Sequence, residues 1–228
     1  MPMGWAGTDS DLCNVVEQQS EACLRVYQED PSRIEEDAHI ELSYAEGGYQ
    51  RSQLFELMQN ATDAMRGQSG RIQLVLTSRG LYAANEGEPF SEQGATTVLA
   101  SHLSRKSEQD IGQFGLGFKS VWAVSHRPVV YSRSGSFAFD REVARNRIEA
   151  AGLSSRRYPV LRLATPVDPI RAGAEDAVLG ELMEWAATVI HLPLYRGRGQ
   201  LAKDLKSFPA EFMLFAPQVT ELRLEDRE

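Results

Sequence analysis

Apolar residues recur first at helical spacing and then at strand spacing, and this change of period divides the chain. From a cap at Asp9 or Ser10, the segment DLCNVVEQQSEACLRVY places apolar side chains close to a 3.6-residue period, which predicts an amphipathic helix. Pro31 suits the first turn of a second helix, SRIEEDAHIELSY, which Gly47 and Gly48 end. A third helix is predicted over about residues 50–66, closing at GQSG.

Strand-like alternation begins after the third helix. RIQLVLTS alternates, turns at Arg79-Gly80 and resumes as GLYAANEG, which predicts a hairpin. Residues 91–110 predict a short helix and a mobile loop, and IGQFGLGFKSVWAVS predicts a glycine-rich turn running into an apolar helix. Strands are then predicted in PVVYSRS, SFAFD, PVLRLATPV, TVIHLPL and VTELRLE, and helices in REVARNRIEAAG, EDAVLGELMEWA and FPAEFMLFAP. This alternation predicts a mixed α/β layered fold.

Composition and charge narrow the class of protein. The 228 residues include 24 Lys and Arg against 32 Asp and Glu, a net charge of −8 that argues against a surface for coating DNA or acidic membranes. The hydrophobic share of 42% is that of a globular protein with a buried core. No stretch approaches the roughly 18 apolar residues of a membrane helix, and MPMGWAGTDSD lacks the features of a signal peptide. We therefore expect a cytoplasmic protein.

Two cysteines lie in the first predicted helix. Cys13 and Cys23 are ten residues apart, beyond the reach of a disulfide within one helix, and have no histidines at metal-ligand spacing. We expect reduced packing residues.

The third predicted helix separates polar from apolar positions. Glu56, Asn60 and Asp63 lie within about 60° of arc on one side. The other side carries the apolar residues Leu54, Leu57, Met58, Ala61 and Met65. A solvated helix face is a sufficient explanation for these polar residues taken alone. Asn is nevertheless a mediocre helix former, so Asn60 in mid-helix invites a further reason.

A glycine-rich turn follows at Gly112, Gly115 and Gly117. Its spacing is G-x-x-G-x-G, which differs from the dinucleotide fingerprint, and it lacks the Gly-Lys-Ser/Thr of a P-loop because Lys119 comes too late. Backbone N–H groups at such a turn, next to a helix N-terminus, can seat a phosphate. A tight loop packed against a sheet is the alternative.

Asn85 and Gly87 follow an apolar strand. An Asn at such a strand end can accept from and donate to a purine edge, and its alternative role is to turn the chain.

Together these segments resemble a known family. ELMQNATDAM, LYAANEGEPF and IGQFGLGFKSV, in this order, are similar to the three nucleotide-binding boxes of the GHKL (Bergerat-fold) ATPase superfamily. That superfamily joins gyrase, heat-shock chaperones, histidine kinases and mismatch-repair ATPases. The first and third boxes resemble the heat-shock chaperone branch. The middle box and EGGYQRSQLFELMQNATDA resemble sacsin-type relatives.

The resemblance covers about residues 30–195 and implies a fold. The expected fold is an α/β (α+β) two-layer sandwich, with a mixed β-sheet covered on one face by helices. We expect residues 1–228 to form a single ATP-binding domain from the N-terminal part of a larger protein. It would contain a helical segment over residues 1–29, the nucleotide-binding core over residues 30–195 and a C-terminal extension over residues 196–228.

The resemblance also implies residue roles around ATP and Mg²⁺. Asn60 would give a side-chain oxygen to Mg²⁺, and Glu56 would orient or deprotonate the attacking water. Asp63 would point towards the adenine or brace its neighbours. Asn85 and Gly87 would meet the adenine. The β- and γ-phosphates would be held by Gly112, Gln113, Phe114, Gly115, Leu116, Gly117 and Phe118.

Three further assignments follow from the resemblance, two of them with alternatives. Lys119 would neutralise phosphate charge or face solvent. Residues 91–110 would form the lid that closes over the nucleotide. Thr188 resembles the family's threonine on the strand beneath the adenine, and Thr165 is a rival for that role.

The chain departs from the family pattern in its middle box. Most relatives carry Asp in D-x-G-x-G, whereas this chain has NEGEP, which replaces the carboxylate with the amide of Asn85. The charge-assisted bond to the adenine amino group is lost, so we expect weaker ATP affinity than in a typical member. The family's Arg or Lys that reaches the γ-phosphate from a following domain has no visible counterpart.

Three functions remain open at this point. The first is a slow Mg²⁺-dependent ATPase whose lid closes on ATP and which then self-associates or docks to a downstream domain. The second is a binding module that keeps the fold without turnover. The third is a sensor kinase, for which His39 loosely resembles a phosphoacceptor but lacks paired dimerisation helices. We expect neither direct nucleic-acid binding nor membrane association.

Overall fold

The first predicted helix begins where the sequence places its cap. In the computed structural model, which describes residues 4–46, 53–65, 67–100, 121 and 123–228, helix α1 (Asp11–Glu29) starts after Ser10. The Cys13 N–H donates to Ser10 Oγ over 3.3 Å, which satisfies one backbone donor of the first turn. The apolar stripe of α1 is buried, and both cysteines on it are buried and free. Burial raises the pKa of the Cys23 thiol above its ordinary value, as expected for a packing residue.

The other helices and strands largely follow the sequence pattern. The helices are α2 (Ser32–Glu46), α3 (Gln53–Asp63), α4 (Glu92–Leu99), α5 (Arg141–Ala150), α6 (Pro169–Glu175), α7 (Ala177–Met183), α8 (Arg198–Lys206) and α9 (Phe212–Phe215). The strands are β1 (Gly70–Thr77), β2 (Leu81–Asn85), β3 (Val129–Ser132), β4 (Phe137–Phe139), β5 (Ala164–Pro166), β6 (Thr188–Leu192) and β7 (Val219–Arg227). Helices α6 and α8 were not predicted.

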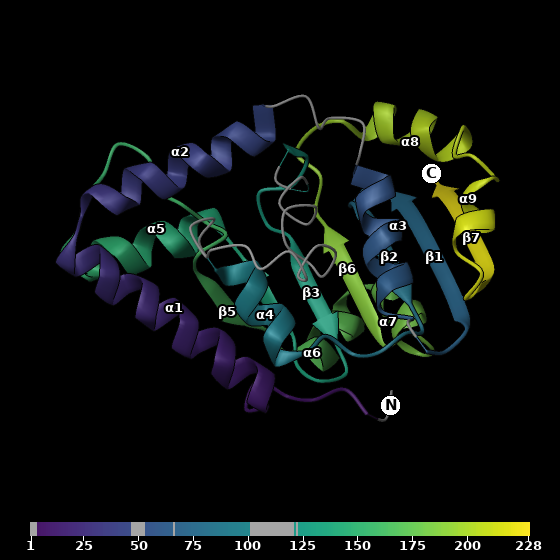
Figure 1. Cartoon of the computed structure of the whole chain (residues 1–228), viewed down its shortest axis with the longest axis horizontal. Coiled ribbons are helices and arrows are strands. Elements are labelled where there is room, and N and C mark those ends of the chain that lie inside the picture. The colour runs from purple at the N-terminus through teal and green to yellow at the C-terminus, as the bar shows by residue number, and fades with distance from the viewer. Residues whose placement is uncertain (1–3, 47–52, 66, 101–120, 122) are drawn as a thin grey trace.

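The strands form one mixed sheet. Its order is β5-β4-β3-β6-β2-β1-β7, and neighbours are antiparallel except for the parallel pair β1 and β7. Figure 1 shows α3 lying across the strands at the β1 side, with α1 and α2 at the opposite side. Both α8 and β7 come from the segment expected as an extension, yet β7 completes the sheet and α8 buries Leu201 and Leu205 in the core.

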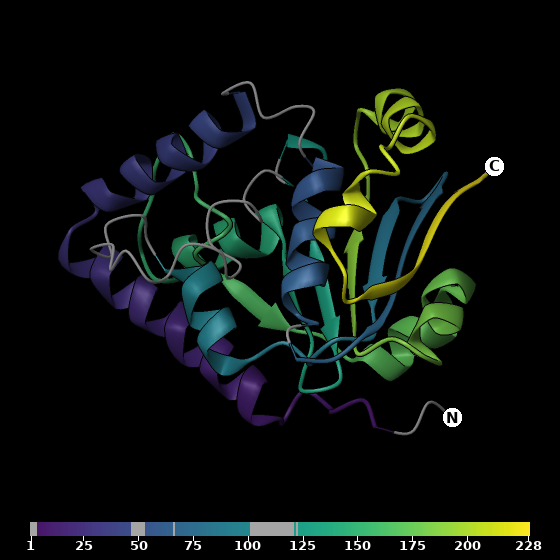
Figure 2. The same cartoon turned by 45° about the vertical axis from the view of Figure 1, so that its right-hand side comes forward.

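Alternating side chains of the sheet build two hydrophobic cores. The larger core lies under α1 to α5 and α8 and includes Ile72, Leu74 and Ile190. The smaller core lies on the opposite face, where Val75, Tyr82 and Val189 pack against α7. Figure 2 shows α6 and α7 on the side of the sheet away from α3. The expected α/β sandwich built on a mixed sheet is confirmed. The expectation of two layers, with helices on one face only, is wrong because the strand residues of the second face are also apolar and pack against α7.

Polar contacts explain two local differences from the sequence prediction. The segment PVLRLATPV forms a strand only at its end because the Glu41 carboxylate binds the N–H groups of Val160 and Leu161, each over 2.8 Å, and removes them from strand pairing. Helix α6 begins where Asp168 caps the N–H groups of the first turn and Pro169 occupies that turn. That Asp-Pro pair is the signal that could have predicted α6.

A buried polar cluster joins α1, α2 and the end of α4. The Tyr27 hydroxyl donates to Asp37 Oδ2 over 2.8 Å, and Arg162 Nε donates to the same oxygen over 3.3 Å. Arg162 also donates to the carbonyl of Leu99, the last residue of α4. We call Tyr27, Asp37 and Arg162 the saturated cluster, since each charged group in it meets an opposite charge or a hydrogen-bond partner.

No helix in the described parts of the chain combines the length and the apolar character needed to cross a lipid bilayer.

Candidate functional site

Helix α3 buries its apolar face as the pattern predicts, but its polar face is not simply solvated. Leu54, Leu57, Met58, Ala61 and Met65 are all buried in the larger core. Asn60, in the middle of the polar face, is only 6% exposed. A solvated face therefore does not account for Asn60, which lies where the helix meets the rest of the molecule. Its neighbours one turn away on either side, Glu56 and Asp63, are half-buried.

The turn after β2 is fastened to the C-terminal end of α3. The Glu88 N–H donates to the Ala64 carbonyl over 2.7 Å, and Gly87 packs so closely that a Cβ there would lie 2.6 Å from the Ala64 carbonyl carbon. Ala64 in turn donates its N–H to the Asn60 carbonyl over 3.0 Å. The turn that carries Asn85 is thus held within one helical turn of Asn60, and only glycine allows this approach.

Three polar residues lie in one row across the sheet. In the strand register, Asn85 at the end of β2 is opposite Thr188 at the start of β6, and Thr188 is opposite Ser132 at the end of β3. All three share the face that carries α3, because they alternate with Ala84, Val189 and Tyr131 of the smaller core. The Thr188 hydroxyl donates to Ser132 Oγ over 3.3 Å. The row therefore lies beside the polar face of α3.

The register also separates the two candidate threonines. Thr165 lies on β5, at the opposite edge of the sheet, and pairs with Ala138. Three strands, β4, β3 and β6, stand between it and β2. Only Thr188 shares a row with Asn85, so Thr165 is not brought to this site.

Two side-chain amide nitrogens at this site, Nδ2 of Asn60 and Nδ2 of Asn85, are buried and find no acceptor among the described residues. Each unpaired buried donor costs about 1 to 3 kcal/mol, so a pair of them on adjacent elements marks a candidate site for a ligand. We call Asn60 and Asn85 the amide pair.

The donor set fits nucleotide and magnesium. An amide can accept from and donate to a purine edge, and Mg²⁺ bound to phosphates needs few protein oxygens. The described residues contain no group of three or more His, Cys, Asp or Glu able to hold a metal by itself. Asn60 offers one amide oxygen on α3, and Glu56 lies one helical turn earlier.

The surroundings of Glu56 change the acidity of its carboxyl group. It is half-buried, and this desolvation raises the pKa of its carboxyl above the ordinary value. A raised pKa makes the carboxylate a better proton acceptor near neutral pH, which is the direction that base catalysis requires.

Several predicted site residues lie outside the described residues. These are the glycine-rich turn and its neighbours, Gly112, Gln113, Phe114, Gly115, Leu116, Gly117, Phe118 and Lys119. Of the predicted lid, only residues 91–100 are described, and α4 confirms the short helix there, capped by Ser91 Oγ accepting from the Gly94 N–H over 3.0 Å. The described end of the predicted apolar helix is a turn in which Val124 and Ser125 donate to the Val121 carbonyl.

Ser132 is a site residue that the sequence patterns missed. Its hydroxyl accepts from the Phe90 N–H over 2.8 Å, which anchors the far end of the turn that begins at Asn85. Ser134 reinforces this anchor by donating to the Phe90 carbonyl over 2.6 Å. The polar SRSGS run at the end of an apolar strand is the signal that could have drawn attention to it.

Comparison with known protein families and with curated proteins found no family model and no curated protein that matches this chain.

Proposed function

We propose that this domain binds Mg²⁺-ATP and hydrolyses it slowly as an ATPase of the GHKL type. The observation that carries the proposal is the amide pair, two buried side chains whose Nδ2 atoms find no acceptor among the described residues. They occupy the positions that the first and middle nucleotide-binding boxes assign to magnesium and adenine. A ligand that satisfies both amides offsets the cost of burying them.

Each residue of the site has a distinct task in this proposal. Asn60 holds Mg²⁺ through its amide oxygen, and Asn85 faces the adenine edge with Thr188 beside it in the row. Gly87 keeps the Asn85 turn against α3, and Ser132 anchors the other end of that turn through Phe90. These contacts hold the Asn85 turn in position before the nucleotide arrives, which lowers the cost of binding.

Hydrolysis depends on Glu56 in this scheme. When bound, Mg²⁺ draws charge from the phosphate oxygens. Glu56 accepts a proton from the attacking water and orients it, and its raised pKa supports that role. A single carboxylate gives modest acceleration, so turnover is slow. In the proposal, nucleotide binding drives lid closure and a conformational switch in a chaperone-like multidomain protein of the cytoplasm.

Nucleotide binding is tested by thermal unfolding with and without Mg²⁺-ATP. Ligand at 100 times its dissociation constant stabilises the folded protein by about 2.7 kcal/mol, a shift of several degrees. Asn60→Ala should remove the shift. Asn14→Ala, on the outer face of α1, is a matched control that should keep it. Absence of a shift with any nucleotide would contradict the proposal and favour a protein-interaction module.

Hydrolysis is tested separately through Glu56. Glu56→Ala should lower phosphate release at least about 100-fold while the thermal shift with ATP persists. Glu35→Ala removes an exposed carboxylate of α2 and should leave turnover unchanged. Parental turnover in Glu56→Ala would exclude Glu56 as the base, and loss of both binding and turnover would instead assign it a structural role.

A further inference from the structure

Strand β7 ends the sheet and offers an open edge. It is nine residues long, and β1 is its single neighbour in the sheet formed by the described residues. Among the described residues, no backbone group of another element bonds to its other side. In Figure 2, β7 forms the outer border of the sheet. A long strand with an unpaired edge is a template for another strand.

One face of β7 carries charges of alternating sign. Glu221, Arg223, Glu225 and Arg227 lie on the face shared with α7, since Glu225 is opposite Val75 of the smaller core. Arg223 binds Glu221 over 2.6 Å, and Arg227 binds Glu225 over 2.6 Å. We call these four residues the charge row.

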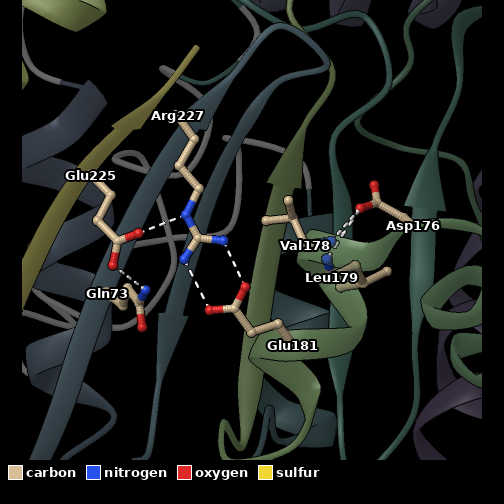
Figure 3. A network of polar contacts seen from close by, with 7 residues as sticks. All are labelled: Gln73, Asp176, Val178, Leu179, Glu181, Glu225 and Arg227. Atoms are coloured by element: carbon tan, nitrogen blue, oxygen red, sulfur yellow. Dashed lines mark hydrogen bonds and ion pairs between the residues drawn. The ribbon is translucent and has the colours of Figure 1, made fainter.

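Neighbouring elements hold the charge row in place. Figure 3 shows the Arg227 guanidinium between Glu225 of its own strand and Glu181 of α7, which it binds over 2.6 and 2.9 Å. Gln73 of β1 donates to the other oxygen of Glu225 over 2.7 Å. The side chains of Glu225 and Arg227 are therefore held in position before any partner approaches.

The alternation makes the row complementary to itself in one direction only. In an antiparallel pair centred on Leu224, Glu221 faces Arg227 of the other copy and Arg223 faces Glu225. Every facing pair then joins opposite charges, and each contributes favourably. In a parallel pair in register, Glu faces Glu and Arg faces Arg, which is unfavourable.

We propose that β7 pairs edge to edge and antiparallel with β7 of a second copy of this chain, joining two seven-stranded sheets into one. Charges on edge strands usually prevent pairing by repulsion. Here the alternating signs oppose a parallel copy and favour an antiparallel copy. The proposal is independent of nucleotide binding, since no residue of the charge row belongs to the site described above.

The test uses two variants, each of which reverses one charge of the charge row. Arg223→Glu places Glu against Glu in its own dimer, and Glu225→Arg places Arg against Arg. Each variant alone should dimerise at least about tenfold more weakly than the parent chain in sedimentation equilibrium. Mixed together, the two variants restore an opposite charge at every facing position. The mixture should therefore form a heterodimer about as tight as the parent dimer.

A matched pair of controls lies on α5. Arg145 and Glu149 form an ion pair over 2.9 Å, with exposure similar to that of Arg223. Arg145→Glu and Glu149→Arg make the same changes of net charge far from β7 in sequence and across the sheet. Both should dimerise as the parent does, which separates facing pairs from overall charge.

The parent chain gives a second measurement that requires no variant to fold. Raising NaCl from about 0.05 M to about 1 M shortens the Debye length and should weaken the dimer about tenfold. A parent chain that stays monomeric up to about 1 mM would overturn the proposal and favour pairing of the β7 edge with a strand of another protein. A dimer that is insensitive to salt, or folded variants that do not recover affinity on mixing, would overturn it as well.

Discussion

The saturated cluster and the amide pair are both buried and polar, but they differ in whether their polar atoms find hydrogen-bond partners. Tyr27 and Arg162 both donate to Asp37, and Arg162 also reaches the carbonyl of Leu99. Asn60 and Asn85 are as deeply buried, yet their Nδ2 atoms meet no acceptor among the described residues. The first set satisfies itself within the chain.

Under the proposed function, this difference separates polar groups that stabilise the fold from polar groups that contact a ligand. A cluster whose groups bond to one another gains nothing from a ligand. Removing one of its members leaves a buried charged group without its partner. An unsatisfied amide costs stability in the free protein and regains it when a ligand binds. The two sets therefore predict opposite responses to substitution, and the effects below run from the largest to the smallest.

The largest effect is expected in the saturated cluster. Asp37→Ala leaves Arg162 as a buried cation without its carboxylate, which should lower the free energy of unfolding by about 3 to 5 kcal/mol in urea titrations. Glu36→Ala, one residue earlier and exposed, should cost less than about 0.5 kcal/mol. A double change of Asp37→Leu and Arg162→Met should recover most of the loss. A cost near that of Glu36→Ala would show that the cluster is not structural.

A second expected effect concerns His191, whose buried Nε2 also lacks a described partner. Its ring stacks on Tyr82 with centroids 4.2 Å apart, and burial lowers its pKa to about 4. The unfolded chain protonates this histidine near pH 6.5 and the folded chain does not, so stability should fall by about 3 kcal/mol as pH decreases from 6.5 to 4. His191→Phe should flatten this part of the pH profile of urea unfolding. An unchanged slope would contradict the assignment.

Gly87→Ala tests how firmly the amide pair is positioned. A Cβ at this residue would meet the Ala64 carbonyl, so the turn must move away from α3 at a cost of about 1 to 3 kcal/mol. The shift carries Asn85 with it and should weaken the thermal response to ATP. Gly199→Ala is the control, since a Cβ there meets nothing within 4 Å. Equal stability of the two variants would exclude the close contact at Gly87.

The smallest effect on stability is expected at the amide pair itself. Asn60→Leu removes a buried amide whose Nδ2 atom finds no acceptor among the described residues, so the unliganded protein should change by less than about 1 kcal/mol or become more stable. The same change should abolish stabilisation by Mg²⁺-ATP. A loss as large as that of Asp37→Ala would place Asn60 with the structural groups and remove the contrast between the two regions.

Local pattern predicted most elements of the fold. The cap at Ser10, the hairpin turn at Arg79-Gly80 and the alternation in VTELRLE all lead to elements in the structure. The local sequence pattern did not predict which distant strands pair with each other. The parallel register of β7 on β1 depends on contacts across about 150 residues, and no short window records them.

The candidate site was predictable to the extent that it is encoded within single elements. The positions of Glu56, Asn60 and Asp63 on one face follow from helical periodicity, and Asn85 follows from its place at a strand end. Whether Asn60 was buried could not be read from the helix alone, because burial depends on what packs against it. The choice of Thr188 over Thr165 likewise required the strand order.

The parallel pair of β1 and β7 has a consequence for how the chain is made. Strand β1 is almost entirely buried in the finished molecule, and its apolar residues Ile72, Leu74, Val75 and Leu76 are fully covered. Its partner strand leaves the ribosome roughly 150 residues later. During that interval β1 has one uncovered border, and a nascent chain at this stage resembles an aggregation-prone intermediate. Synthesis of β7, rather than early collapse, is what covers this border of β1.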